Sequence, residues 1–217
     1  MEIISAFLGS VLVTAGSYIA LCVYDKKHSL ETKRKGNFIY SASMIGVMCL
    51  TFSTVFMIGM TRHAEWKPFN ILLHYILIFG MSVLAVTDYR QHRIPNKFLI
   101  GLLMIWASIT GIHIIMRTES GMEQAFQSLA GGLAGGLIFL LCYILSKKQL
   151  GAGDVKLVFV MGLYLTGQRI IGAIFYGIVF CCVYSVVQLI RRKIGLRDGV
   201  ALVPFLYLGV LITLCIL

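Results

Sequence analysis

Apolar residues dominate the chain, and short polar segments interrupt them at intervals. A membrane-spanning helix needs about 20 consecutive apolar residues, and six stretches approach or exceed that length. They run over Ile3–Val23, Phe38–Met60, Phe69–Thr87, Phe98–Met116, Ala125–Ser146 and Val200–Leu217. A seventh region, 155–190, is too long for one span, and its main polar interruption is TGQR at 166–169. The number of helices therefore depends on how this region is divided.

The distribution of Lys and Arg decides the division. If the chain turns at TGQR, helices form over about Val155–Leu165 and Ile170–Ile190, and the polar segments between all helices alternate in charge. The segments that then share one side are 25–37, 88–97, 147–156 and 191–198. They hold 15 of the 19 Lys and Arg residues, and cytoplasmic loops collect these residues. The sequence therefore predicts an all-α, polytopic bundle of about eight transmembrane helices with both termini outside.

Composition supports this class. The 217 residues are 59% hydrophobic, have a mean hydropathy of +0.88 and carry a formal net charge of +10. These values exclude an ordinary soluble domain. The basic excess is explained by orientation and contact with anionic lipids, so nucleic-acid binding is not expected. Only Glu2 precedes the first apolar stretch as a charged residue, so a cleaved secretory signal is not expected either.

Cysteine and histidine patterns indicate no metal site. The cysteines fall inside predicted helices without CxxC spacing, which predicts small apolar packing residues and no disulfide framework. They are Cys22, Cys49, Cys142, Cys181, Cys182 and Cys215. The five histidines are scattered and form no HExxH motif. The chain also lacks a GxSxG elbow and a P-loop, so serine hydrolysis and nucleotide-driven transport have no support.

Two of the four aspartates directly adjoin predicted spanning helices. Asp88 ends the third apolar stretch in SVLAVTD, and Asp154 begins the sixth helix in DVKLVFV. Asp25 and Asp198 lie in basic loops, where a solvated charge is expected. Asp154 alone could be a helix N-cap, whereas the C-terminal end of a helix disfavours an anion at Asp88. Carboxylates close to hydrocarbon are costly, and two at one membrane face predict a functional pair.

The residues around both aspartates favour turns and close approach. Pro95 in YRQHRIPNKF interrupts helical geometry after Asp88. Gly151 and Gly153 before Asp154 permit unusual backbone conformations or the approach of another chain. A flexible loop is an alternative explanation, but both segments directly flank a carboxylate, which favours a role at the site. The sequence LAGGLAGGL contains overlapping GxxxG pairs, Gly131 with Gly135 and Gly132 with Gly136, which predict close helix packing.

These segments resemble a known family. GAGDVKL at 151–157, preceded by DYRQHRIPN at 88–96, is similar to the two signature segments of the type IV prepilin peptidases, which are membrane aspartyl proteases of the GxGD class. VPFLYLG at 203–209 is a weaker match to that family's last helix. The resemblance covers about 69–217 and implies that Asp88 and Asp154 are the catalytic pair. It implies site-shaping or substrate-approach roles for Gly151, Gly153, Lys156, Pro95 and Asn96.

The resemblance also implies a domain organisation and a substrate. Residues 1–68 would form two helices with a basic loop, and 69–217 a six-helix peptidase core. The family removes a short basic leader from pilin-like precursors at the cytoplasmic face of the bacterial cytoplasmic membrane. Bifunctional members carry a domain with CxxC pairs and N-methylate the product, whereas DKKHSLETKRKGN at 25–37 has no cysteine. A form with peptidase activity alone is therefore expected.

The chemistry predicted for such a pair needs no metal or other cofactor. Two carboxylates that share a water cannot both ionise easily, so one stays protonated. Because Asp154 begins a helix and has Lys156 nearby, we expect Asp154 to be the anion and Asp88 the acid. Two alternatives are a transporter or secretion-system assembly subunit, and a presenilin-like GxGD protease. Transporters usually carry charges near mid-membrane, which the predicted helices here almost entirely lack.

Overall fold

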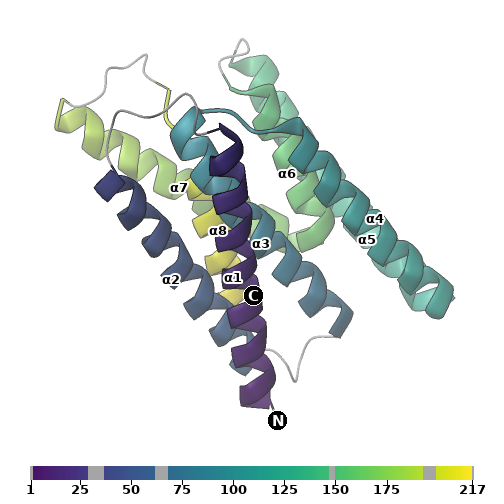
Figure 1. The fold of residues 1–217 in the computed structure, drawn as a ribbon. Helices are drawn as coiled ribbons and strands as arrows, with labels where there is room; N and C mark the ends of the chain where they lie inside the picture. The colour runs from purple at the N-terminus through teal and green to yellow at the C-terminus, as the bar shows by residue number, and fades with distance from the viewer. Residues whose placement is uncertain (1, 29–36, 62–67, 147–149, 193–198, 217) are drawn as a thin grey trace.

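The computed structural model describes residues 2–28, 37–61, 68–146, 150–192 and 199–216, and these form eight α-helices and no strand (Figure 1). The helices are α1 Glu2–His28, α2 Asn37–Thr61, α3 Pro68–Gln91, α4 Asn96–Met116, α5 Thr118–Leu145, α6 Ala152–Leu165, α7 Gly167–Ile190 and α8 Val203–Ile216. The predicted all-α bundle of eight helices is confirmed.

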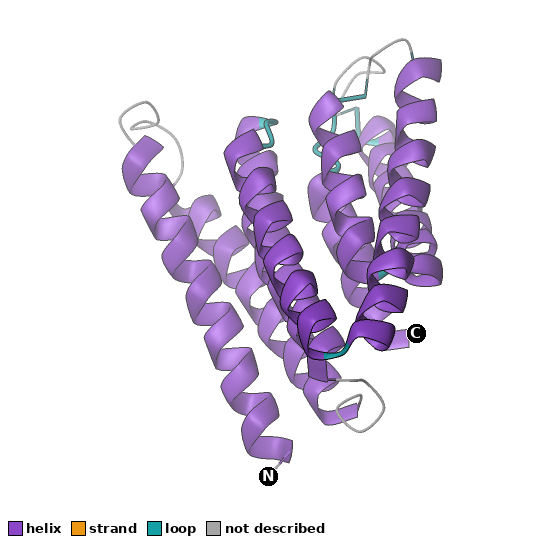
Figure 2. Ribbon diagram, turned by 90° about the vertical axis from the view of Figure 1, so that its right-hand side faces the viewer, coloured by secondary structure: helices purple, strands orange, loops and turns teal. Residues whose placement is uncertain are grey.

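The helices share one approximate direction (Figure 2), and consecutive helices run in opposite senses. The C-terminal ends of α1, α3, α5 and α7 therefore lie at the same end of the bundle as the N-terminal ends of α2, α4, α6 and α8. We call this the loop-rich end. The basic residues described there are Arg90, Arg93, Lys97, Lys156, Arg191 and Arg192. Arg117 and Arg169 lie at the opposite end. The other basic residues of the predicted loops fall outside the described side chains.

Four helices are long and apolar enough to cross a membrane, namely α3, α4, α5 and α7. Shorter apolar helical stretches run over Ala6–Cys22, Ile45–Gly59 and Val203–Ile216. With 14 residues, α6 is about 21 Å long, which is short of the hydrocarbon thickness of roughly 30 Å. These helices, in a bundle of this composition, make the chain a membrane protein.

The helix α3 is the central element of the bundle. Two thirds (67%) of the apolar stretch of α3 is buried inside the bundle, against 17% for α4 and 22% for α7. Its neighbours include α1, α2, α8, α6 and α4. One continuous core joins its buried side chains to those of α6 and α8, for example Met81, Met161 and Tyr207. Helix α3 therefore packs against other helices on several sides.

The division of region 155–190 is confirmed, and the corner is tighter than predicted. Helix α6 ends at Leu165 and α7 begins at Gly167, so Thr166 alone makes the turn, with φ at +61°. Most helices extend beyond their predicted bounds, whereas α8 begins at Val203 and not at Val200. Helix α5 begins at Thr118, and α3 continues to Gln91. Asp88 therefore lies inside the last turn of α3 and not at its end.

The predicted glycine packing is present between α5 and α6. A methyl group at Gly131 would lie 2.7 Å from the carbonyl oxygen of Gly162, and one at Gly162 would collide with the backbone of Gly131. Gly132 and Gly136 receive the side chains of Leu163 and Phe159. Because these α5 positions are glycines without side chains, α6 can approach α5 closely. This contact fixes the position of the helix that carries Asp154.

Candidate active site

Asp88 reaches the site from the last turn of α3. It is 6% exposed, and its Oδ2 accepts a hydrogen bond from the backbone N–H of Val203 at 3.1 Å. Val203 is the first residue of α8, so this N–H has no partner within its own helix. The positive end of the α8 dipole therefore points at the carboxylate. Burial raises the pKa of the Asp88 carboxyl above its usual value, and the Val203 N–H opposes part of this rise across 115 residues of sequence.

Asp154 lies in the first turn of α6, ahead of the apolar stretch that begins at Val155. The N-cap residue is Gly151, which makes Asp154 the third residue of the helix. From this position a carboxylate can fold back toward the N-cap, as in a capping box. A methyl group at Gly151 would lie 2.8 Å from Asp154 Oδ2, so the carboxylate occupies the space that a side chain would fill. Gly151 itself has an ordinary extended backbone (φ −69°, ψ 132°).

The two carboxylates influence one another. Burial and then the negative charge of Asp88 raise the pKa of Asp154 from 3.8 to about 6, and the backbone of Gly151 opposes this rise. Helices α3 and α6 pack against each other, as a functional pair requires. The structure thus places the carboxylates, 66 residues apart in sequence, close enough to interact at the loop-rich end. The raised pKa is opposite to the effect expected from a helix N-terminus alone.

The turn after Asp88 packs against the start of α6. Pro95 is the N-cap of α4, and Ile94 approaches Gly153, where an added methyl group would lie 3.3 Å from Ile94 Cβ. Gly153 thus allows the two signature segments to meet. One residue further on, Asn96 Oδ1 accepts a hydrogen bond from Lys156 Nζ at 3.4 Å.

Lys156, in contrast, lies away from the pair. Residues two positions apart on an α-helix point about 200° apart, so Lys156 and Asp154 occupy opposite sides of α6. The structure therefore does not bring Lys156 beside the two carboxylates. Asp25 lies within α1 and not in the expected loop, and Asp198 falls outside the described residues.

Sequence reasoning did not anticipate the contribution of Val203. A signal was present, because Val203 precedes Pro204 and helices often begin near such a proline. Nothing in the sequence indicated that the first N–H of this helix would point at Asp88. Among the described residues, no group of three or more His, Cys, Asp or Glu side chains is arranged to hold a metal ion. The site as described consists of two carboxylates and backbone groups.

Comparison with known proteins places this site in a family. No solved structure matches the chain. The "Prepilin leader peptidase/N-methyltransferase" of Bacillus subtilis (strain 168) is 24% identical over 173 residues. This match covers 80% of the chain and 64% of the relative, so the chain spans less than two thirds of that protein's length. The profile of the type IV leader peptidase family matches residues 75–186, which is just over half of the chain and includes both aspartates. The chain therefore belongs to the type IV leader peptidase family.

Proposed function

We propose that the chain is a membrane-embedded aspartyl endopeptidase that removes the short basic leader of pilin-like precursors. The observation that carries the proposal is the meeting of Asp88 and Asp154 at one end of the bundle, where the charge of one alters the pKa of the other. Membership of the type IV leader peptidase family supports the same reaction class. The six described basic residues at the loop-rich end favour a cytoplasmic position for the site in the bacterial cytoplasmic membrane.

The contacts favour a division of roles that reverses the sequence-based expectation. Burial raises the pKa of both carboxyl groups, that of Asp154 to about 6, and at Asp88 the N–H of Val203 opposes the rise by stabilising the ionised form. Asp88 is therefore the base that accepts a proton from the attacking water, and Asp154 is the acid that donates a hydrogen bond to the peptide carbonyl. A bound peptide excludes water, which raises the pKa of Asp154 further and preserves its proton near neutral pH.

Each proton that a carboxyl group gains or loses in this mechanism is returned before the reaction ends. Water adds to the carbonyl carbon, its proton passes to Asp88, and the Asp154 proton moves to the developing oxyanion. Collapse of the tetrahedral centre breaks the C–N bond as Asp88 returns its proton to the leaving amine, and Asp154 regains its own proton from the gem-diol. Each carboxyl group ends in its starting state.

The decisive experiment is cleavage of a precursor with a short basic leader by purified protein in liposomes. Asp88→Asn and Asp154→Asn should each lower the rate by about 10²–10⁴-fold, because either change removes a proton-transfer group. Glu119→Gln is the matched control, since Glu119 is an exposed acid at the other end of the bundle. If both variants cleave as fast as wild type, Asp88 and Asp154 are not the catalytic pair. Product mass in the presence of a methyl donor would test the expectation that N-methylation is absent.

A further inference from the structure

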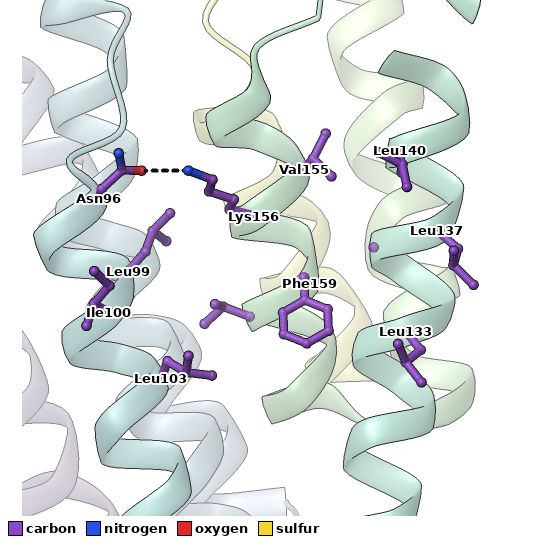
Figure 3. Close-up of a pocket in the computed structure, with 12 residues that line it drawn as sticks. Asn96, Leu99, Ile100, Leu103, Leu133, Leu137, Leu140, Val155, Lys156 and Phe159 are labelled. Carbon is purple, nitrogen blue, oxygen red and sulfur yellow. Dashed lines mark hydrogen bonds between the residues drawn. The ribbon is translucent and has the colours of Figure 1, made fainter. Parts of the chain in front are cut away.

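An apolar groove lies between α4, α5 and α6. Its volume is 620 Å³, within the range of roughly 300–1,000 Å³ typical of ligand sites. In Figure 3 the labelled side chains of the three helices converge on this space. Its apolar lining consists of Leu99, Ile100, Leu103, Leu133, Gly136, Leu137, Leu140, Val155, Phe159 and Val160. The groove is thus formed by three helices and not by the surface of one.

The groove lies on the side of α6 that faces away from the catalytic pair. Val155, Lys156, Phe159 and Val160 line it, and their spacing defines one face of the helix. Asp154 is about 200° from Lys156 on the same helix. At the loop-rich end, the contact between Gly153 and Ile94 lies beside the first turn of α6. A substrate helix in the groove would therefore be separated from the carboxylates by α6 itself.

Only one end of the groove is polar. Lys156 and Asn96 stand there, joined by the 3.4 Å hydrogen bond, and every other lining residue is apolar or glycine. Lys156 is exposed, and Asn96 is the first residue of α4, so the positive end of a helix dipole lies beside the ammonium group. No acidic residue lines the groove. This end is therefore suited to an anion.

The remaining length of the groove is open to the hydrocarbon of a membrane. Ile100 is 59% exposed on α4, and Leu133 and Leu137 are 54% and 55% exposed on α5. In a bilayer such side chains face lipid and not water. A ligand of this groove can therefore enter sideways from the bilayer, with an apolar body along the leucines and an anionic group at Lys156.

We propose that the groove holds one phospholipid with an anionic headgroup. Its phosphate pairs with Lys156 and displaces or shares the Asn96 contact, and an acyl chain lies along Leu137 and Phe159. A basic side chain near the membrane surface favours a lipid with a net negative charge over zwitterionic phosphatidylcholine, and the apolar groove fixes the position of a single lipid. This site is independent of the proposed peptidase reaction.

The test uses phosphatidylglycerol with a photoreactive acyl chain in phosphatidylcholine liposomes, with labelled residues located by mass spectrometry. We expect labels on the groove residues of α4, α5 and α6, and competition by phosphatidylglycerol but not by phosphatidylcholine. Leu133→Trp should reduce this labelling at least fivefold by filling the groove. Leu129→Trp, one turn away, exposed and outside the lining, is the matched control and should label as wild type.

Lys156→Gln separates headgroup recognition from the shape of the groove. It should retain labelling but lose the preference for phosphatidylglycerol, and it leaves the apolar walls intact. Labelling spread evenly over all lipid-facing helices would overturn the proposal, as would equal competition by both lipids. Preferential cross-linking of the groove to the apolar helix of a precursor would identify a substrate site instead and would equally reject the lipid.

Discussion

The two sides of α6 carry an acidic and a basic residue, Asp154 and Lys156, only two positions apart, and their surroundings differ. The side with Asp154 faces α3, where partial burial, the carboxylate of Asp88 and the backbone of Gly151 determine the pKa of Asp154. The side with Lys156 borders an apolar groove that opens outward. The first side is partly buried against another helix, and the second is open to hydrocarbon.

This difference shows how one short helix can position a carboxylate on one side and line an apolar groove on the other. Because α6 has only 14 residues, its position depends on its neighbours and not on its own length. On one side, α6 packs against the glycines of α5. Toward α4, Tyr164 donates a hydrogen bond to the carbonyl oxygen of Leu102 at 2.7 Å. Four predicted effects test the contacts that hold α6 and the surroundings of Asp154.

The largest expected effect is at the contact of α5 with α6. In Gly162→Ala, the added methyl group meets backbone atoms of Gly131, which cannot rotate away. We expect a loss of about 3 kcal/mol in the free energy of unfolding, measured by denaturant titration in micelles. Gly101→Ala is the control, because a methyl group there meets nothing within 4 Å and alanine favours a helix. Equal stability of the two variants would mean that the glycine contact does not fix α6.

The second effect is a pH-dependent stabilisation by Asp154→Asn. In the folded protein the pKa of Asp154 is raised from 3.8 to about 6, so the folded state binds this proton more tightly than the unfolded chain. The stability that this bound proton contributes to the folded state is fully present below about pH 4 and is lost as pH rises through 6. An uncharged Asn avoids the loss. The variant should therefore match wild type near pH 4 and gain up to about 3 kcal/mol at pH 8.

Thermal unfolding at both pH values measures this difference. Glu119→Gln removes an exposed acid and should change little at either pH. A melting-temperature difference between Asp154→Asn and wild type that is the same at pH 4 and pH 8 would contradict a raised pKa for Asp154.

The third effect concerns the geometry of the carboxylate. Gly151→Ala places a methyl group 2.8 Å from Asp154 Oδ2, and the flexible carboxylate must rotate. Small displacements of catalytic groups cost about 10-fold or more in rate, so we expect kcat/KM to fall about 10-fold while the melting temperature changes little. Gly167→Ala at the opposite end of the bundle has open space around it and serves as the control. Unchanged kcat/KM in Gly151→Ala would mean that cleavage does not depend on this conformation of Asp154.

The smallest effect is at the far end of α6. Tyr164→Phe removes the buried hydrogen bond to Leu102 and should lower the free energy of unfolding by about 1 kcal/mol. Tyr184→Phe removes a hydroxyl group from an exposed tyrosine that packs on Phe205, and it should be neutral. If both variants are equally stable, this bond does not support α6.

Much of the architecture could be read from the chain. Apolar length and the positions of Lys and Arg predicted eight helices and the break at Leu165, because the requirement to satisfy backbone groups in hydrocarbon leaves few alternatives. Helix ends were less accurate. Helix α3 continues through Asp88 to Gln91 because polar residues are compatible with a helix once it leaves the apolar layer.

The sequence by itself determined the helices, the shared end of Asp88 and Asp154, and the motifs that indicate the family. Only the tertiary structure decided the chemistry around them. The N–H that reaches Asp88 comes from Val203, burial and the charge of Asp88 raise the pKa of Asp154, and the groove needs three helices. Local patterns specify helices because their hydrogen bonds join residues four positions apart. Proton affinity and cavities depend on neighbours tens of residues away, so packing alone defines them.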